Sequence, residues 1–150
     1  MSAPPGSEAS KRRLRFWLQL LKASRHVENI LRERLRREFS TTLPRFDVMA
    51  MLHRSGTGLK MSQLSGQLMV SNGNVTGIID RLAGEGLVER VAIAGDRRAT
   101  LVRLTPEGAA RFRRMAETHE RWIAELFGDM DEAEMERMIA MLTRLREGRQ

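Results

Sequence analysis

The order of patterns between residues 62 and 104 constrains the fold more than any other feature of the chain. Apolar side chains recur at helical spacing in residues 62–69 and again in residues 74–85, and Val-Ser-Asn-Gly at 70–73 interrupts the period. Residues 87–93 and 100–104 are rich in β-branched types and partly alternate, with a glycine in the segment 94–99 between them. Such a pattern is typical of a hairpin. The sequence therefore predicts two helices joined by a tight turn and followed by a two-stranded wing.

Further helices are predicted on both sides of this unit. Residues 11–39 contain no glycine or proline and show helical spacing over a wide apolar face, with Ser10 as a possible N-cap. A second helix runs from Pro44 to Arg54. The broad face of the first helix needs more partner surface than one short neighbour offers, which favours a dimer over packing within one chain.

Two helices follow the wing. Thr105-Pro106-Glu107 supplies an N-cap, a proline in the first turn and a carboxylate at the positive end of the helix dipole. Asp131 and Glu134 form an acidic variant of a capping box for the last helix. The fold class that we expect is mainly α with a small β-wing, a winged helix-turn-helix with terminal dimerisation helices.

Composition narrows the class of protein. The chain has 150 residues, 41% of them hydrophobic, which is enough for one core, so we expect a single unit at 11–150 after a disordered tail at 1–10. No apolar run is long enough for a membrane span or a signal peptide. The absence of cysteine excludes disulfides and thiolate zinc sites and fits the cytoplasm, where we expect the protein. A net charge of +7 favours a polyanionic partner, although high arginine usage can also be a genomic habit.

Catalytic and metal sites have little support in the sequence. The three histidines, at 26, 53 and 119, are scattered, and His119-Glu120 lacks the second histidine of a zinc-protease helix. Gly56-Thr57-Gly58 follows a helix and has no third glycine, so it is not a dinucleotide loop. No serine lies in a nucleophile elbow. We therefore expect neither an enzyme nor a bound metal or cofactor.

The second helix of the motif has the composition of a helix that reads the major groove of DNA. Asparagine can pair bidentately with adenine, hydroxyls suit phosphate oxygens, and glycines permit close approach. In this helix, residues 74–85, the side chains predicted to point into the protein are Val75, Ile78, Ile79 and Leu82. The residues left for DNA are Ser71, Asn72, Gly73, Asn74, Thr76, Gly77 and Arg81, with Asp80 also outward. The alternative is that Gly73 is only a turn residue and that Asn72 or Asn74 is only a cap.

The wing tip offers a second contact with DNA. Arg97 and Arg98 follow Asp96 at the predicted turn, where an exposed guanidinium could enter the narrow minor groove. The carboxylate of Asp96 could brace one of the two arginines. The same residues would also suit an ordinary solvated hairpin, but their position directly after a helix-turn-helix favours the DNA contact.

Residues 61–108 resemble the MarR (multiple-antibiotic-resistance regulator) family of winged helix-turn-helix repressors. The resemblance rests on Asn74-Val75-Thr76, Asp80-Arg81-Leu82, Glu85-Gly86-Leu87-Val88, Asp96-Arg97-Arg98 and Leu104-Thr105-Pro106-Glu107-Gly108, together with Leu64-Ser65 and Leu68. It implies a homodimer on a pseudo-palindromic operator in double-stranded DNA, with dimerisation helices at 11–43 and 105–150 and the winged lobe at 44–104. It also implies that Arg98 enters the minor groove and that Arg97 contacts phosphate.

The resemblance further implies a small-molecule effector. Residues 14–50 are similar to family members that control hydroxycinnamate and other aromatic-acid catabolism, so the expected function is repression relieved by a small aromatic acid or its CoA thioester. The expected effector residues are Trp17, Leu21, Arg25, Phe46, Met49 and His53. Plain core packing is the alternative for Trp17, Phe46 and Met49. Arginines at 32, 34, 36 and 37 would suit CoA phosphates, but glutamates at 28, 33 and 38 favour ion pairs along the helix surface. The alternative function is a ligand-independent architectural DNA-binding protein.

Overall fold

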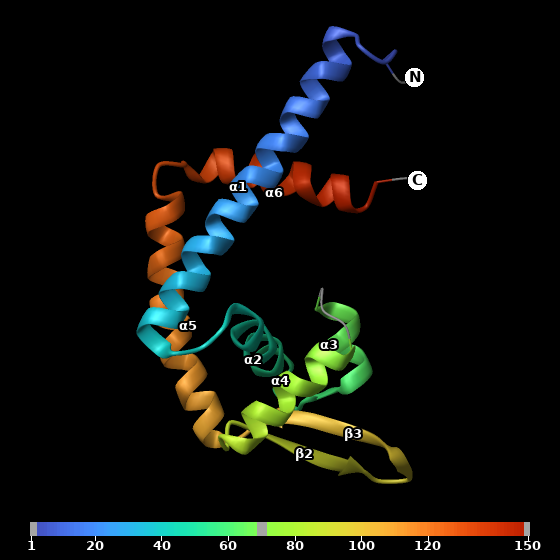
Figure 1. Ribbon diagram of the computed structural model, residues 1–150, viewed down its shortest axis with the longest axis vertical. Coiled ribbons are helices and arrows are strands. Elements are labelled where there is room, and N and C mark those ends of the chain that lie inside the picture. Colours follow the sequence, from blue (N-terminus) through green and yellow to red (C-terminus); the bar gives the residue numbers. More distant parts are fainter. Residues whose placement is uncertain (1–2, 69–71, 149–150) are drawn as a thin grey trace. The chain divides into compact units, whose positions relative to one another are not determined.

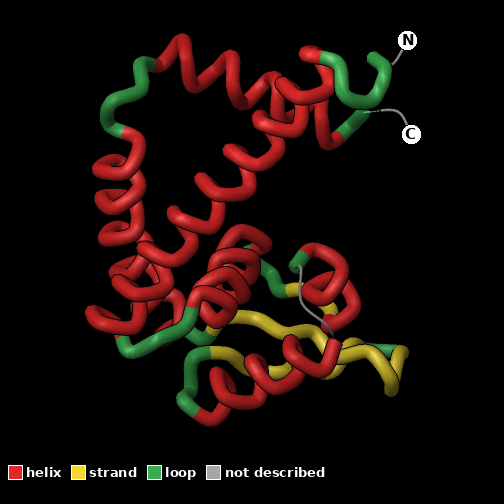
Figure 2. Tube along the Cα trace, turned by 45° about the horizontal axis from the view of Figure 1, so that its top comes forward, coloured by secondary structure: helices red, strands yellow, loops and turns green. Residues whose placement is uncertain are grey.

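The computed structural model describes residues 3–68 and 72–148 and is mainly helical (Figure 1). Among the described residues, strands occur only between residues 59 and 104, and helices make up most of the rest (Figure 2). The described elements, in chain order, are α1 (Glu8–Phe39), α2 (Leu43–Ser55), β1 (Leu59–Lys60), α3 (Met61–Gln67), α4 (Asn72–Gly84), β2 (Val88–Ile93), β3 (Asp96–Leu104), α5 (Pro106–Phe127) and α6 (Glu132–Arg146). This confirms the expected fold class. The residues up to Ala116 form one compact unit and those from Glu117 onward form a second, so that α5 contributes to both.

The first helix begins earlier than the sequence analysis expected. The Ser7 hydroxyl, not that of Ser10, is the N-cap, and it accepts the Ser10 N–H at 3.2 Å. Glu8 to Ser10 therefore belong to α1 and not to the tail, because a carboxylate at Glu8 is favourable at the positive end of the helix dipole. The helix ends at Ser40, whose left-handed backbone, with φ of 51°, lets its N–H bond back to the last turn.

Side chains cap the other long helices as well, at Thr105 and Asp131 as predicted and at Thr42, which the sequence analysis did not identify as a cap. Thr42 caps α2 by accepting the Arg45 N–H at 3.2 Å, next to a proline in the first turn. Thr105 accepts the Gly108 N–H at 3.0 Å at the start of α5. Asp131 accepts the Glu134 N–H at 2.7 Å at the start of α6. Each hydroxyl or carboxylate satisfies a helix N–H that has no partner within its own helix.

The wing has three strands instead of the two expected. The short strand β1 pairs with β3 antiparallel, Leu59 opposite Val102, and the order in the sheet is β1-β3-β2. The turn is also tighter than predicted, because Ala94 and Gly95 alone connect the strands and β3 begins at Asp96. Gly95 makes this two-residue turn possible with a φ of +85°. Asp96, Arg97 and Arg98 thus belong to a strand and not to a six-residue loop.

The core of the first unit lies where α2, α3 and α4 meet the sheet. Side chains that are almost fully buried come from all of these elements: Val48, Met49, Leu52, Leu64, Val75, Ile79, Leu82, Leu87 and Val102. The first half of α5 closes this core, since the Phe112 ring lies 5.4 Å from that of Phe46 and 5.0 Å from that of His53, centroid to centroid. The winged motif is therefore held rigidly by its own apolar contacts.

Two helices carry large apolar side chains on their surfaces. In the first half of α1, Leu14 is 60% exposed and Trp17 is 53% exposed, so Trp17 does not pack in the core. In α6, which belongs to the second unit, Ile139 is 63% exposed and no described residue is fully buried. The described helices include none with an apolar stretch long enough to cross a bilayer.

Candidate nucleic-acid interface and adjoining cavity

Helix α4 buries one narrow face and leaves the rest of its surface open. Val75, Ile79 and Leu82 are fully buried, as predicted. Ile78 was expected to point inward with them, but it is only half-buried and lines a cavity. The reason is geometric, because positions 75, 79 and 82 are spaced by four and three residues and define one stripe, and position 78 lies to the side of it.

The exposed part of α4 divides into two stripes. Asn74, Gly77 and Arg81 lie on the side that faces α1 and α2, together with Ile78. Thr76 and Asp80 lie on the side of the wing, where Thr76 borders a second hollow with Ser65, Arg90 and Thr100. The predicted DNA-contacting residues of this helix thus face two different neighbourhoods.

An ion pair links the wing side of α4 to the sheet. The Arg90 guanidinium, on β2, donates to the Asp80 carboxylate, and both side chains are exposed. Across the sheet, Arg103 Nε donates to Glu89 Oε1 at 2.6 Å. The Asp80–Arg90 pair joins α4 to the wing at the surface, and exposed pairs of this kind contribute little to stability. Sequence reasoning placed Asp80 outward but did not foresee its partner, since Arg90 is ten positions away on another element.

Part of the predicted DNA contact lies outside the described part of the chain. This holds for Ser71, for the side chains of Asn72, Arg97 and Arg98, and for the exposure of Gly73. The backbone places Asn72 and Gly73 in the first turn of α4 and places Arg97 and Arg98 in β3. Asp96 is exposed at the start of β3. The roles of all ten predicted DNA-contacting residues stay predictions.

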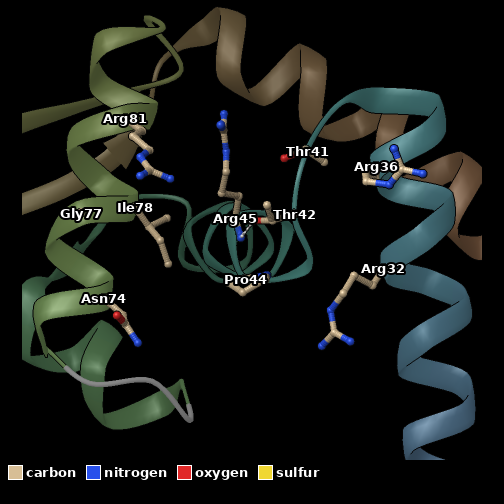
Figure 3. A pocket seen from close by; sticks show the side chains of 10 residues that line it. All are labelled: Arg32, Arg36, Thr41, Thr42, Pro44, Arg45, Asn74, Gly77, Ile78 and Arg81. Carbon is tan, nitrogen blue, oxygen red and sulfur yellow. Dashed lines mark hydrogen bonds between the residues drawn. The ribbon is translucent and has the colours of Figure 1, made fainter.

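A cavity of about 570 Å³ lies between α1, α2 and α4 (Figure 3). Its walls are Arg32 and Arg36 from α1 on one side and the stripe of α4 on the other. Its floor is the start of α2 and the turn before it, Thr41, Thr42, Pro44 and Arg45. A cavity of this size could hold a small organic ligand. The sequence analysis considered Arg32 and Arg36 as partners for CoA phosphates but favoured ion pairs along the helix surface, because nothing in the local pattern shows that α4 lies opposite them.

The four arginines of the cavity differ in how they are paired. Arg36 donates to both oxygens of Glu33, at 2.6 and 3.2 Å, and these bonds hold the pKa of the Glu33 carboxyl below its ordinary value. Arg45 pairs with Glu85, the residue after α4, and its buried Nε has no hydrogen-bond partner. Arg32 donates to the Asn29 amide oxygen at 3.0 Å, which carries no charge. Within the described residues, neither Arg32 nor Arg81 forms an ion pair.

The six predicted effector residues lie elsewhere than in this cavity. Trp17, Leu21 and Arg25 follow one another at four-residue intervals along α1, on the N-terminal side of Arg32. Phe46 and Met49 are buried in the core, as the packing alternative predicted, and His53 is exposed against Phe112. Their role in binding an effector stays a prediction. Across the described residues, no three acidic, histidine or cysteine side chains gather as metal ligands would.

Comparison with known proteins agrees with the winged motif. Residues 41–100 match the model of the MarR family. A crystal structure of a MarR family transcriptional regulator from Silicibacter pomeroyi is 34% identical, with a TM-score of 0.77, over 94% of this chain and 97% of that one. The chain belongs to the MarR family. Its winged helix-turn-helix is thus that of a MarR-type transcriptional regulator, not of an enzyme.

Two curated relatives with HTH-type regulator names differ in how much of their own length the match covers. The regulator PecS of Dickeya dadantii is 34% identical over 67% of this chain, which spans only 61% of PecS. The repressor IacR of Pseudomonas putida is 28% identical over 85% of this chain and 74% of its own length. Both are named as regulators of transcription. The likeness extends beyond the family-model match into the helices on either side of the winged motif.

Proposed function

We propose that the protein is a homodimeric regulator that binds a pseudo-palindromic operator through α4 and the wing. The observation that carries this proposal is the surface of α4, where Asn74, Thr76 and Gly77 are exposed directly above fully buried Val75 and Ile79. An exposed helix face of small and polar residues fits the major groove, where an asparagine can read adenine. Since that face has a rigid base, it enters the groove without rearrangement.

The wing supplies the second contact of the proposed complex. Arg97 and Arg98 lie directly after the two-residue turn, at the start of β3. A guanidinium at the end of a hairpin can enter the narrow minor groove, where the negative potential is enhanced. We assign that role to Arg98 and a phosphate contact to Arg97. The Asp80–Arg90 pair joins α4 to the wing, so the two proposed contacts come from elements that touch one another.

Dimerisation is supported by the apolar surfaces of α1 and α6. Four large apolar side chains, Leu14, Phe16, Trp17 and Leu18, are exposed in one stretch of α1, and Met138, Ile139 and Leu145 are exposed on α6. A monomeric protein rarely exposes so many large apolar side chains. In a two-fold dimer, the same apolar surface of each subunit would be buried against the other subunit. Analytical ultracentrifugation at micromolar protein concentration should give a mass twice that of the chain. A monomeric mass would contradict the proposal that a dimer binds two operator half-sites.

The regulation that we propose is repression relieved by a small aromatic acid or its CoA thioester. IacR is named a repressor, and the cavity beside α4 places cationic groups next to the residues that would touch DNA. The second candidate, an architectural DNA-binding protein without ligand, is favoured by the net charge of +7 alone. The regulator should prefer one DNA sequence, whereas the architectural protein should bind all sequences alike, because phosphate contacts carry no information about the bases.

Selection from random duplexes tests the proposal. Repeated selection should enrich one inverted repeat, whereas equal retention of all sequences would favour the architectural protein.

On the enriched duplex, Arg98→Ala should weaken DNA binding about tenfold or more, while the melting temperature of the protein stays unchanged. Arg113→Ala, an exposed arginine of α5, is the matched control and should bind as the wild type does. Asn74→Ala should relax the base preference at one position of each half-site. Wild-type affinity of Arg98→Ala would refute the wing contact.

A further inference from the structure

We infer that the ion pair between Arg45 and Glu85 positions α4 for reading bases, because it fixes the end of that helix against the start of α2. The inference rests on the proposed function, since it concerns how the helix that is proposed to read DNA is held. Arg45 and Glu85 are positioning residues, and neither belongs to the predicted DNA-contacting residues.

Each charge of this pair lies at the unfavourable end of its own helix. Arg45 is in the first turn of α2, where the helix dipole is positive, and Glu85 directly follows α4, where the dipole is negative. Neither charge therefore stabilises the helix beside it. The Arg45 guanidinium donates to the Glu85 carboxylate, so that each charge compensates the other across two separate elements.

Burying the Arg45 side chain costs free energy. This side chain is 16% exposed, whereas that of Glu85 is 44% exposed. The buried Nε of Arg45 has no hydrogen-bond partner among the described residues, and a buried donor without a partner opposes folding. Since an ion pair that is partly removed from water adds little net stability, what this pair provides is a fixed separation between α2 and α4.

The end of α4 is also attached to the start of α5. The Thr105 hydroxyl donates to the Gly86 carbonyl at 2.6 Å, and the Thr105 N–H donates to the Leu87 carbonyl at 3.0 Å. The buried side chains of α4 fix which face of the helix is inside, but apolar contacts are not directional and tolerate a small rotation. The Arg45–Glu85 pair supplies a second polar attachment, and two attachments on different sides oppose such a rotation.

A small rotation at this end becomes a large displacement at the other end of α4. Figure 3 shows Arg45 on the side of α4 that carries Arg81, whereas Asn74 lies toward the opposite end of the helix. Asn74 is roughly 16 Å from Glu85 along the helix axis, at a rise of about 1.5 Å per residue. A rotation of roughly 10° would move Asn74 by roughly 3 Å, which is enough to break a hydrogen bond to a base.

Glu85→Gln tests the inference sharply, because positioning and simple electrostatics predict opposite effects on DNA binding. If only charge matters, removing a negative charge beside the DNA-binding helix should tighten binding to every duplex. If the pair positions α4, affinity for the selected operator should fall about tenfold, the worth of one base contact, and affinity for a shuffled duplex should change less than about threefold. Operator affinity equal to or above that of the wild type would overturn the inference.

Glu33→Gln is the matched control for this variant. It makes the same change of charge and also removes ion pairs, but these pairs lie within α1 alone. Operator binding should therefore stay as in the wild type. An equal loss in Glu33→Gln and Glu85→Gln would show that the loss does not come from the position of α4.

Exchange of the two charges separates positioning from a direct contact of Arg45 with DNA. Arg45→Gln should lower operator affinity as Glu85→Gln does, and the double variant Arg45→Glu with Glu85→Arg should restore it to within about threefold of the wild type. The double variant should also be at least as stable, because each charge then lies at the favourable end of its helix. If Arg45→Gln weakens binding to every duplex equally and the exchange restores nothing, Arg45 contacts phosphate and the inference fails.

Distances between spin labels test the position of α4 without DNA. Because the chain has no cysteine, the exposed sites Arg54→Cys on α2 and Thr76→Cys on α4 can carry the two labels, with unlabelled protein in excess. Glu85→Gln should shift or broaden the label distance by roughly 2 Å, as the same rotation requires, and Glu33→Gln should not. An unchanged distance in Glu85→Gln would refute the positioning role. If selection yields no operator, the proposed function fails, while the label distances still decide whether the pair positions α4.

Discussion

Gly108→Ala should loosen the joint between α4, the wing and α5. An added Cβ at this position would lie 1.9 Å from the Leu87 carbonyl oxygen and 2.8 Å from its carbonyl carbon. Both atoms belong to the backbone, and real Cβ atoms do not approach other heavy atoms within 3.0 Å. No change of rotamer relieves this clash, so the first turn of α5 and the start of β2 must move apart by about 1 Å.

The magnitude follows from the hydrogen bonds that this movement breaks. The Thr105 N–H donates to the Leu87 carbonyl at 3.0 Å, and the Thr105 hydroxyl donates to the Gly86 carbonyl at 2.6 Å. Losing two such bonds costs about 1–3 kcal/mol, and leaving the Leu87 carbonyl unsatisfied adds about 1–3 kcal/mol. Replacing a glycine inside a helix by alanine raises the free energy of unfolding by about 0.5–1 kcal/mol, which offsets part of this loss. The net loss in the free energy of unfolding is about 1–5 kcal/mol, a fall in melting temperature of about 2–20 °C for a chain of this length.

Thermal and urea unfolding of the two glycine variants form the assay. Gly84→Ala is the matched control, because an added Cβ there meets no atom within 4 Å and the backbone is helical. It should raise the free energy of unfolding by up to about 1 kcal/mol, opposite in sign to Gly108→Ala. A Gly108→Ala variant as stable as the wild type would show that α5 does not pack this closely against Leu87 and would refute the reasoning.

Two further predictions concern α4 and the second unit. In urea unfolding, Ile79→Ala should lower the free energy of unfolding by about 2–5 kcal/mol, because Ile79 is fully buried. Ile78→Ala should lower it by less than half as much, because Ile78 is only half-buried. Equal losses would mean that α4 is rotated about its axis. Burial lowers the pKa of His119 below its ordinary value of 6.5, against the opposing effect of Glu120. The unfolded chain then binds more protons below about pH 6.5, so stability present above that pH is lost on acidification. The melting temperature should fall between about pH 7.5 and pH 5.5, and His119→Gln should make that fall smaller; an unchanged fall would contradict the assignment.

Local signals in the sequence predicted the fold well. Caps at Thr105 and Asp131 were foreseen because a hydroxyl or carboxylate can satisfy helix N–H groups within three residues of itself. The hairpin was foreseen because its strands are β-branched and its turn contains a glycine. The length of the strands was not foreseen, because the sequence does not show that the two residues Ala94 and Gly95 are enough to form the turn. The third strand was missed for a similar reason, since two residues at Leu59–Lys60 carry no periodic pattern.

Contacts between distant elements were beyond the sequence. The pairs Asp80–Arg90 and Arg45–Glu85 join residues on different elements, and charged residues are so frequent here, at 30%, that many other pairings were equally plausible. The cavity was missed because α1, α2 and α4 meet only in three dimensions. The packing of Phe46 against Phe112 likewise depends on α5.

Helix α4 illustrates why the site was only partly predictable. Its pattern identified an inward face and an outward face, and it treated every outward residue as available to DNA. A helix among neighbours has more than two sides, however, and α4 presents Asn74, Gly77 and Arg81 toward α1 but Thr76 and Asp80 toward the wing. The two stripes are therefore not equivalent, because Asn74, the proposed base-reading residue, lies on the side of the cavity and Thr76 lies on the side of the wing.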